Sequence, residues 1–284
     1  MTKLEDYSTK EYPTWCPGCG NFGIWNALKE AFVKLNLLPN TTVLVSGIGC
    51  SGKVPYWTRT YGFCGLHGRP LPVATGIKLV NHKLNVIAIS GDGDGYGEGT
   101  CHFIHTARRN LDITYLVHNN QVYGLTTGQA SPTSDPGFIT KSTPQGAIEQ
   151  AVNPLTLAIS AGATFVARGY AGDIKHLSNL IALAVKHKGF ALVDILQPCV
   201  TFNHLNTFQW FSKRVYKLKA PLKDKAKAFV KAQEWGNKIP IGVFYQEKKQ
   251  LYEEEHLKQV NKDKPLVDYD ISNIDVSKLM DEFV

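Results

Sequence analysis

The stretch from Gly91 to Asn120 constrains the fold of this chain most strongly; its sequence is GDGDGYGEGTCHFIHTARRNLDITYLVHNN. The apolar residues 84–90 before it predict a strand, and residues 97–110 predict an amphipathic helix. A second apolar strand is expected at residues 113–117. A strand, a glycine turn, a helix and a strand form a right-handed βαβ crossover between parallel strands. We therefore expect an α/β fold: a mostly parallel sheet, helices on both faces, and ligands at the carboxyl ends of its strands.

Two side chains at that edge of the sheet suit a magnesium diphosphate. Asp92 in the turn and Asn120 after the second strand offer hard oxygen ligands, and Mg²⁺ completes its octahedron with waters and substrate phosphates. Glycines at 91, 93, 95, 97 and 99 allow backbone N–H groups to approach an anion closely. The alternative is a glycine-rich turn whose Asp only caps a helix. The Asn pair after a second strand favours the metal site.

Composition limits the class of protein. The chain of 284 residues is long enough for one large α/β domain, with or without an appendage. It has no apolar run near the length of about 20 residues that spans a bilayer, and its polar start differs from a signal peptide, so we expect a cytoplasmic protein without membrane contact. The net charge of +7 is scattered and no nucleic-acid motif is present. An acidic protein or an anionic cofactor suits that charge better than nucleic acid.

The remaining chain up to residue 199 continues the α/β pattern. Helices are expected at 22–35, 71–81, 154–161 and 173–187, and strands at 42–46, 164–168 and 190–196. Residues 54–70 predict an aromatic loop, and residues 130–145 predict a polar loop whose length suggests a function. We expect residues 1–199 to form a ligand-binding domain with an N-terminal cysteine arm.

Residues 200–284 differ in character from the preceding chain. Helices are predicted at 210–216 and 222–235, a short strand at 241–245, and a charged tail after them. We expect this part to be an extension that packs on the core or on a partner subunit.

The six cysteines are candidates for metal binding, because disulfides are not expected in a cytosolic protein of this size. Four of them fall at or near the expected carboxyl edge of the sheet: Cys16, Cys19, Cys50 and Cys199. Four thiolates that meet there could hold an iron–sulfur cluster or Zn²⁺, and the spacing alone does not decide between the two. Cys64 and Cys101 are expected to be structural, with Cys101 buried in its helix.

Two further side chains are expected near the ligand edge. Lys53 closes the glycine turn after the strand at 42–46, where the alternative is an ordinary surface lysine. His67, next to Arg69, could contact a diphosphate, and the alternative is a loop histidine that is bonded to backbone.

Several motifs between residues 15 and 199 resemble one family closely: WCPGCGNFG, SGIGCSGKVP, CGLHGRPLPVATG, GDGDGYGEG, HNNQVYGLTTGQASPT and QPC. GDG followed about thirty residues later by NN resembles the thiamine diphosphate signature. The whole set is similar to the β subunits of two-subunit 2-oxoacid:ferredoxin oxidoreductases found in archaea. The resemblance implies the thiamine diphosphate-binding fold.

The resemblance also implies roles for individual residues. Mg²⁺ would be held by the side chains of Asp92 and Asn120 and by the carbonyl of Val122. The four cysteines Cys16, Cys19, Cys50 and Cys199 would ligate one [4Fe–4S] cluster, which is favoured over zinc. The residues implied to line thiamine diphosphate are Ile48, Gly49, Cys50, Ser51, His67, Gly93, Asp94, Gly124 and Leu125. Lys53 and Leu125 are implied to meet the 2-oxoacid.

The implied reaction is the coenzyme A-dependent oxidative decarboxylation of a 2-oxoacid, such as pyruvate or 2-oxoglutarate, with electrons passing to ferredoxin. Thiamine enzymes need a carboxylate against the aminopyrimidine, and the α/β pattern here is used by the diphosphate half. We therefore expect an α subunit to complete the site, in an αβ or α₂β₂ assembly. Two alternatives remain open: a non-redox decarboxylase or transketolase-type subunit with a structural metal, and an electron-transfer module without catalysis.

Overall fold

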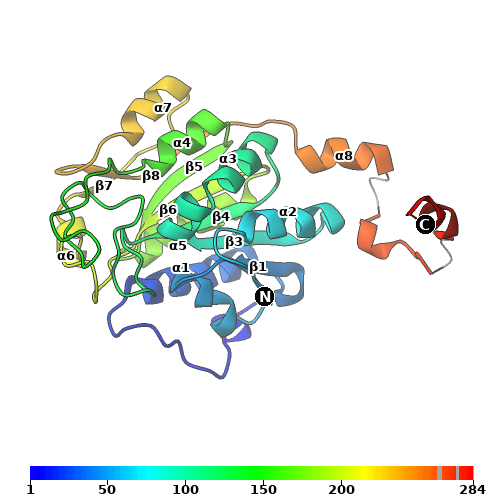
Figure 1. Cartoon of the computed structure of the whole chain (residues 1–284), viewed down its shortest axis with the longest axis horizontal. Coiled ribbons are helices and arrows are strands. Elements are labelled where there is room, and N and C mark those ends of the chain that lie inside the picture. Colours follow the sequence, from blue (N-terminus) through cyan, green and yellow to red (C-terminus); the bar gives the residue numbers. More distant parts are fainter. Residues whose placement is uncertain (261–263, 273–274, 284) are drawn as a thin grey trace.

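A single eight-stranded sheet forms the centre of the computed structural model, which describes residues 1–260, 264–272 and 275–283 (Figure 1). Its strand order is β2-β1-β3-β4-β6-β5-β8-β7. The strands are β1 (Thr42–Ser46), β2 (Tyr61–Cys64), β3 (Asn85–Gly91), β4 (Thr114–Asn119), β5 (Phe165–Tyr170), β6 (Ala191–Leu196), β7 (Val215–Lys217) and β8 (Ile239–Gln246). Neighbouring strands pair in parallel, except that β8 runs antiparallel to β5.

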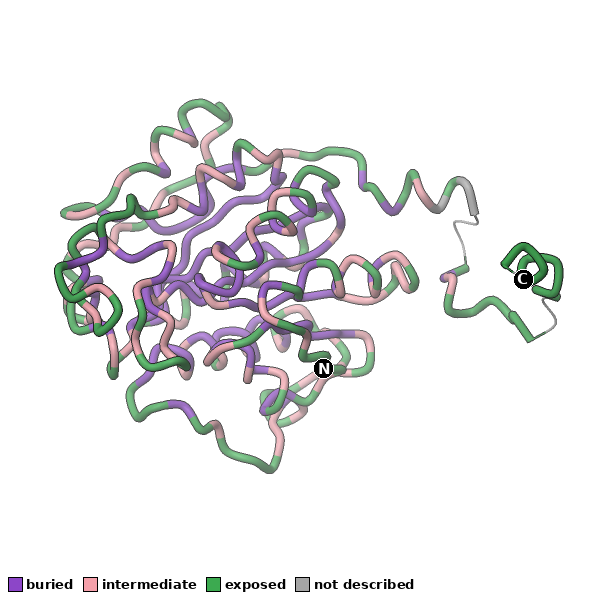
Figure 2. Tube along the Cα trace, in the orientation of Figure 1, coloured by how far each residue is buried: buried purple, intermediate pink, exposed green. Residues whose placement is uncertain are grey.

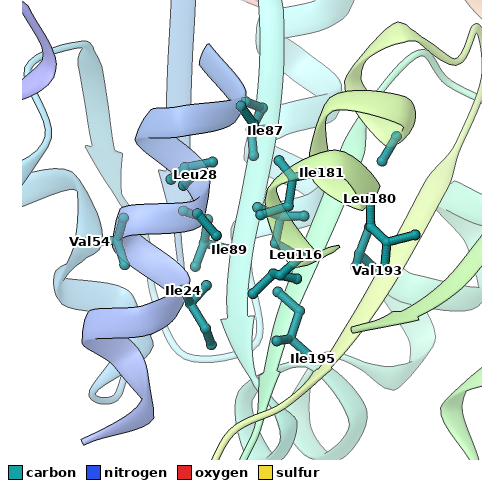
Figure 3. Close-up of a cluster of buried hydrophobic side chains, with 14 of the residues drawn as sticks. Ile24, Leu28, Val54, Ile87, Ile89, Leu116, Leu180, Ile181, Val193 and Ile195 are labelled. Carbon is teal, nitrogen blue, oxygen red and sulfur yellow. The ribbon is translucent and has the colours of Figure 1, made fainter. Parts of the chain in front are cut away.

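Helices cover both faces of the sheet and bury its apolar residues. On one face lie α1 (Gly20–Leu35) and α5 (Ile174–Lys186); on the other lie α2 (Pro70–Val80), α3 (Thr100–Arg109), α4 (Pro154–Ala161) and α7 (Lys225–Ala232). Successive residues of β3 alternate between the two cores, with Ile87 and Ile89 facing α1 and α5 (Figure 3). Val86 and Ala88 belong to the opposite core. Burial on both faces explains why the central strands are continuous apolar runs.

The structure confirms the expected fold class and corrects details of it. The helix predicted at 97–110 is replaced at its start by a π-helical turn, Gly93–Glu98, and α3 begins only at Thr100. The predicted aromatic loop at 54–70 overlaps the end of a 3₁₀ helix, Ser51–Trp57, and includes the edge strand β2. Cys101 is exposed, so the prediction of its burial is wrong. The buried face of α3 is supplied by Phe103, Thr106 and Ala107, at helical spacing, and Cys101 lies off that face.

The C-terminal part contributes two strands to the same sheet. The helix predicted at 210–216 is wrong in its second half, because α6 spans Phe208–Ser212 and β7 begins at Val215. A β-branched and an aromatic residue, Val215 and Tyr216, favour a strand when a neighbouring strand is available for pairing. Helix α7 is shorter than the predicted 222–235, and β8 is longer than the predicted 241–245. The division into domains at 199/200 stays a prediction.

The remaining elements follow β8 or lie near the N-terminus. They are η1 (Leu4–Tyr7), η2 (Pro39–Thr41), α8 (Tyr252–Val260), η5 (Leu266–Asp268), α9 (Ser277–Met280) and η6 (Asp281–Phe283). The described residues of the last 20 positions are mostly exposed and extend away from the sheet, whereas buried residues concentrate in the strands (Figures 1 and 2). Within the described residues, no helix is both long enough and apolar enough to cross a bilayer.

Candidate functional site

A cavity of about 160 Å³ lies at the carboxyl ends of β1, β3 and β4. The structure brings together there all nine residues that the resemblance implies for thiamine diphosphate, together with Asp92, Asn120 and Val122. Lys53 does not line this cavity; it is half-buried and lies close to Cys50. Burial raises the pKa of the Cys50 thiol, and the positive charge of Lys53 opposes part of that rise. The cavity therefore contains every residue that the resemblance implies for the cofactor and the metal, whereas Lys53, which is implied to meet the 2-oxoacid, lies outside its lining.

The buried carboxylate of Asp92 is held by hydroxyl groups from a distant loop. Its Oδ2 accepts hydrogen bonds from Ser131 Oγ at 2.5 Å and from Thr133 Oγ1 at 2.6 Å. Burial raises the pKa of this carboxyl to about 6, against the opposing effect of the two hydroxyls. The side-chain oxygen Oδ1 of Asn120 accepts a hydrogen bond from the Val122 backbone N–H at 3.1 Å. These two oxygen-bearing side chains and the Val122 carbonyl are suited to Mg²⁺ by donor type.

Asp94 uses both of its oxygens to hold the walls of the cavity. Oδ1 accepts bonds from the backbone N–H groups of Ile48, at 3.0 Å, and Gly68, at 2.7 Å, while Oδ2 accepts one from Ser90 Oγ at 2.6 Å. A Cβ atom at Gly47 would lie 1.9 Å from Asp94 Oδ2, so only glycine fits there. Asp94 therefore fixes two loops of the site rather than offering a free carboxylate.

Aromatic and imidazole side chains complete the lining. His67 lies at the mouth of the cavity, 3.7 Å from Asp94 Oδ1 and 3.6 Å from Glu98 Oε2. His118 is buried, and its Nδ1 is 2.7 Å from Asn21 Oδ1; burial lowers the pKa of this imidazole to about 3, so it is neutral. Sequence reasoning missed His118 and Tyr123, as well as the hydroxyls that hold Asp92. The motif HNNQVYGLTTGQASPT contains all of them and was the available clue.

The four candidate cysteines line a second cavity next to the first. Cys50, Asn120, Gly124 and Gln197 line both cavities. A Cβ atom at Gly124 would lie 3.8 Å from Cys199 Sγ and 3.9 Å from Cys50 Sγ, so both sulfurs approach the backbone of this glycine. The two cavities therefore share a wall that includes a residue without a side chain.

The cysteines differ in exposure and in protonation. Cys16 is exposed and Cys19 is buried. Burial, with smaller contributions from the Cys199, Cys50 and Cys16 thiols, raises the pKa of Cys19 to about 12. Gln197 Nε2 donates to Cys19 Sγ at 3.4 Å, and Trp15 Nε1 donates to the Cys50 carbonyl at 2.7 Å. Among the described residues, no three His, Cys, Asp or Glu side chains are grouped closely around one single-ion position.

Comparison with known proteins decides the family. Residues 47–195 match the family model of the C-terminal, TPP-binding domain of thiamine pyrophosphate enzymes, and residues 199–262 match that of the C-terminal part of the pyruvate ferredoxin oxidoreductase β chain. The 2-oxoacid:ferredoxin oxidoreductase subunit beta of Saccharolobus solfataricus is 53% identical over 251 residues, which are 83% of this chain and 82% of the relative. The chain belongs to the family of 2-oxoacid:ferredoxin oxidoreductase β subunits.

Other members of this family agree with that assignment. Subunit beta of 2-oxoacid:ferredoxin oxidoreductase 1 from Aeropyrum pernix is 48% identical over 271 residues, covering 91% of this chain and 85% of the relative. A solved 2-oxoglutarate:ferredoxin oxidoreductase from Magnetococcus marinus, with 2-oxoglutarate, coenzyme A and succinyl-CoA bound, superposes with a TM-score of 0.89. It is 35% identical, and the match covers 99% of this chain and 96% of that chain. The predicted family, the thiamine diphosphate-binding fold and the assignment to an oxidoreductase are confirmed; the roles of individual residues stay predictions.

Proposed function

We propose that this chain carries the diphosphate half of the active site in a 2-oxoacid:ferredoxin oxidoreductase, which converts a 2-oxoacid and coenzyme A to an acyl-CoA and CO₂. Pyruvate, 2-oxoglutarate and related acids are the candidate substrates. The observation that carries the proposal is the wall shared by the cofactor cavity and the four-cysteine cavity. A non-redox thiamine enzyme has no need for four thiols against its cofactor pocket.

The residues of the first cavity fit Mg²⁺ and a diphosphate. Asp92, Asn120 and the Val122 carbonyl would hold the metal, and the two lining glycines at 91 and 93 let the backbone approach an anion closely. When bound, thiamine diphosphate supplies an electron sink for decarboxylation, while the protein supplies binding and orientation. In our proposal the substrate meets Leu125, which is exposed at the mouth of the cavity, and the cationic Lys53.

The residues of the second cavity fit a [4Fe–4S] cluster. All four cysteines line it, and a cluster accepts thiolates that lie farther apart than the ligands of a single ion. A cluster held by these four cysteines would supply one-electron transfer between the thiamine cofactor and ferredoxin. Because ligating cysteines must be thiolates, binding has to displace the proton that the raised pKa of Cys19 retains.

A second subunit is needed to complete the site. The carboxylates that line the cofactor cavity are Asp92 and Asp94, and both are already hydrogen bonded. The carboxylate that thiamine enzymes place against the aminopyrimidine therefore has to come from an α subunit. Exposed apolar side chains near the cavity and on the edge strand β2 suit such a partner: Ile48, Tyr61, Phe63, Leu66 and Leu125. The assembly would be αβ or α₂β₂.

Iron analysis of the αβ complex, isolated without oxygen, tests the proposal. We expect about four irons and matching acid-labile sulfide per β subunit, and a fast-relaxing S = ½ EPR signal after reduction by dithionite. Cys199→Ser should lose the signal, whereas Cys101→Ser, at an exposed cysteine outside both cavities, should keep it. Zinc without iron, in a complex that still binds thiamine diphosphate, would instead support the non-redox alternative.

A further inference from the structure

Two hydroxyl groups converge on one oxygen of the proposed metal ligand Asp92. Ser131 Oγ and Thr133 Oγ1 lie 2.5 and 2.6 Å from Asp92 Oδ2, and all three side chains are buried. Hydrogen bonds to a buried carboxylate are charge-assisted and therefore strong. Both hydroxyls bond Oδ2, and neither of them bonds Oδ1 of the same carboxylate.

The position of Thr133 is fixed by the two residues that flank Asn120. Gln121 Nε2 donates to the Thr133 carbonyl at 2.8 Å, and Asn119 Oδ1, 2.8 Å from Thr133 Oγ1, is the alternative acceptor for the single hydroxyl proton that also reaches Asp92. Ser134 Oγ, next in the chain, donates to the Gln121 carbonyl at 2.7 Å. The loop that carries the hydroxyls is therefore tied to the end of β4, the same point that places Asn120 in the cofactor cavity.

The same network continues into the interior of the sheet. Asn119 Nδ2 donates to Asp194 Oδ1 at 3.0 Å, and Arg168 Nε lies 3.6 Å from Asp194 Oδ2. All of these side chains are buried. The network contains two carboxylates, of Asp92 and Asp194, and one guanidinium, so its formal charge is negative when both acids are ionised. A divalent cation at Asp92 offsets that charge.

We propose that Ser131 and Thr133 are positioning residues for Mg²⁺: by holding Asp92 Oδ2, they orient the carboxylate so that Oδ1 faces the ion. The inference rests on the proposed function, because it takes Asp92 as a metal ligand. Outer-shell hydrogen bonds of this kind fix the orientation of a ligand before the metal arrives. The otherwise irregular loop after β4 thereby acquires a role in metal affinity.

The variant Thr133→Val tests the proposal, because it removes the hydroxyl with little change in volume. The measurement is a Mg²⁺ titration of the αβ complex at fixed thiamine diphosphate, followed by quenching of tryptophan fluorescence. We expect Thr133→Val to weaken the apparent Mg²⁺ affinity roughly 10- to 100-fold. Thr133→Ser, which restores the hydroxyl, should bind within about threefold of the wild type. Thr106→Val is the matched control, since within the described part of the chain the buried Thr106 hydroxyl bonds only the His102 carbonyl of its own helix.

Each outcome has a distinct meaning. Wild-type affinity in Thr133→Val would overturn the positioning role, as would equal weakening in Thr133→Val and Thr133→Ser, because packing rather than the hydroxyl would then be responsible. If Thr133→Val does not fold, Ser131→Ala gives the same test, with weakening expected and unchanged affinity contradicting the proposal. If the wild-type complex binds no thiamine diphosphate with Mg²⁺, the proposed function itself is contradicted. This result is distinguishable from failure of the inference, which is judged only by comparing the variants with a wild type that binds.

Discussion

The backbone nitrogen of Gly68 lies 2.7 Å from Asp94 Oδ1, across 26 residues of chain. The same oxygen holds the Ile48 N–H, and Ser90 holds the other oxygen. One buried carboxylate therefore joins the turn after β1, the loop before α2 and the end of β3. The shape of the cofactor cavity therefore depends on this one carboxylate, both of whose oxygens are hydrogen bonded.

Asp94→Ala should loosen all three segments at once. The change leaves three donors without their acceptor, which costs about 3 kcal/mol or more in free energy of unfolding. We expect the Tm of this chain to fall by roughly 5 °C and thiamine diphosphate binding to weaken. Differential scanning calorimetry provides the measurement. Asp275→Ala, at an exposed tail carboxylate, serves as the control and should leave Tm unchanged.

Gly93→Ala should impair the site through a steric clash. A Cβ atom at Gly93 would lie 2.1 Å from the Tyr123 ring, a contact that requires the ring to move. We expect at least about tenfold weaker thiamine diphosphate binding, a loss of about 1.4 kcal/mol. Isothermal titration calorimetry measures it.

The double variant Gly93→Ala/Tyr123→Ala separates the clash from other effects of the methyl group. It should recover part of the affinity lost in Gly93→Ala, because the ring that the methyl meets is absent. Gly76→Ala is the control, since among the described residues no atom beyond the neighbouring turns of its own helix lies within 4 Å of a Cβ atom at that position. Full affinity in Gly93→Ala would contradict the packing described around Tyr123.

Mg²⁺ affinity should depend on pH through Asp92. Burial raises the pKa of this carboxyl to about 6 in the metal-free protein, and a metal ligand must be ionised. Affinity should be constant above about pH 7 and fall up to tenfold per pH unit below pH 6. The folded-state pKa of Asp92 lies above its ordinary value of 3.8, so burial of the ionised carboxylate destabilises the metal-free fold at neutral pH. Protonation removes that cost, and the free energy of unfolding therefore rises as the pH falls from 6 towards 4. Titrations between pH 5 and 8, with circular dichroism at each pH, distinguish lost binding from unfolding.

Lys53→Met should affect the substrate rather than the cofactors. If Lys53 meets the 2-oxoacid carboxylate from outside the cofactor lining, its replacement should raise KM about tenfold and leave thiamine diphosphate binding and iron content unchanged. Steady-state kinetics with ferredoxin as acceptor, together with iron analysis, provide the readouts. A loss of iron would point to the other effect of this lysine, its charge beside Cys50.

The sequence predicted those parts of the molecule that have a local pattern. The apolar runs of β3 and β4 and the glycine turn between them placed Asp92 and Asn120 at one edge of the sheet, as found. Val215 and Tyr216 were assigned to a helix because their strand exists only through pairing with β8. The hydroxyls of Ser131 and Thr133 were missed for a similar reason: their partner lies 39 and 41 residues away, and an irregular loop has no period to reveal it.

The antiparallel strand β8 has a consequence for how this chain reaches its native state. β5 pairs with β6 on one side and with β8 on the other, so one edge of β5 stays open until residue 246 has been synthesised. Ile239 and Ile241 of β8 also cover Tyr170 and Leu196 in a small core at that side of the sheet. A nascent chain that ends at residue 199 would expose the unpaired edge of β5 to other chains. The final third of the chain, through β8, therefore closes the strand edge that the first two-thirds leave open.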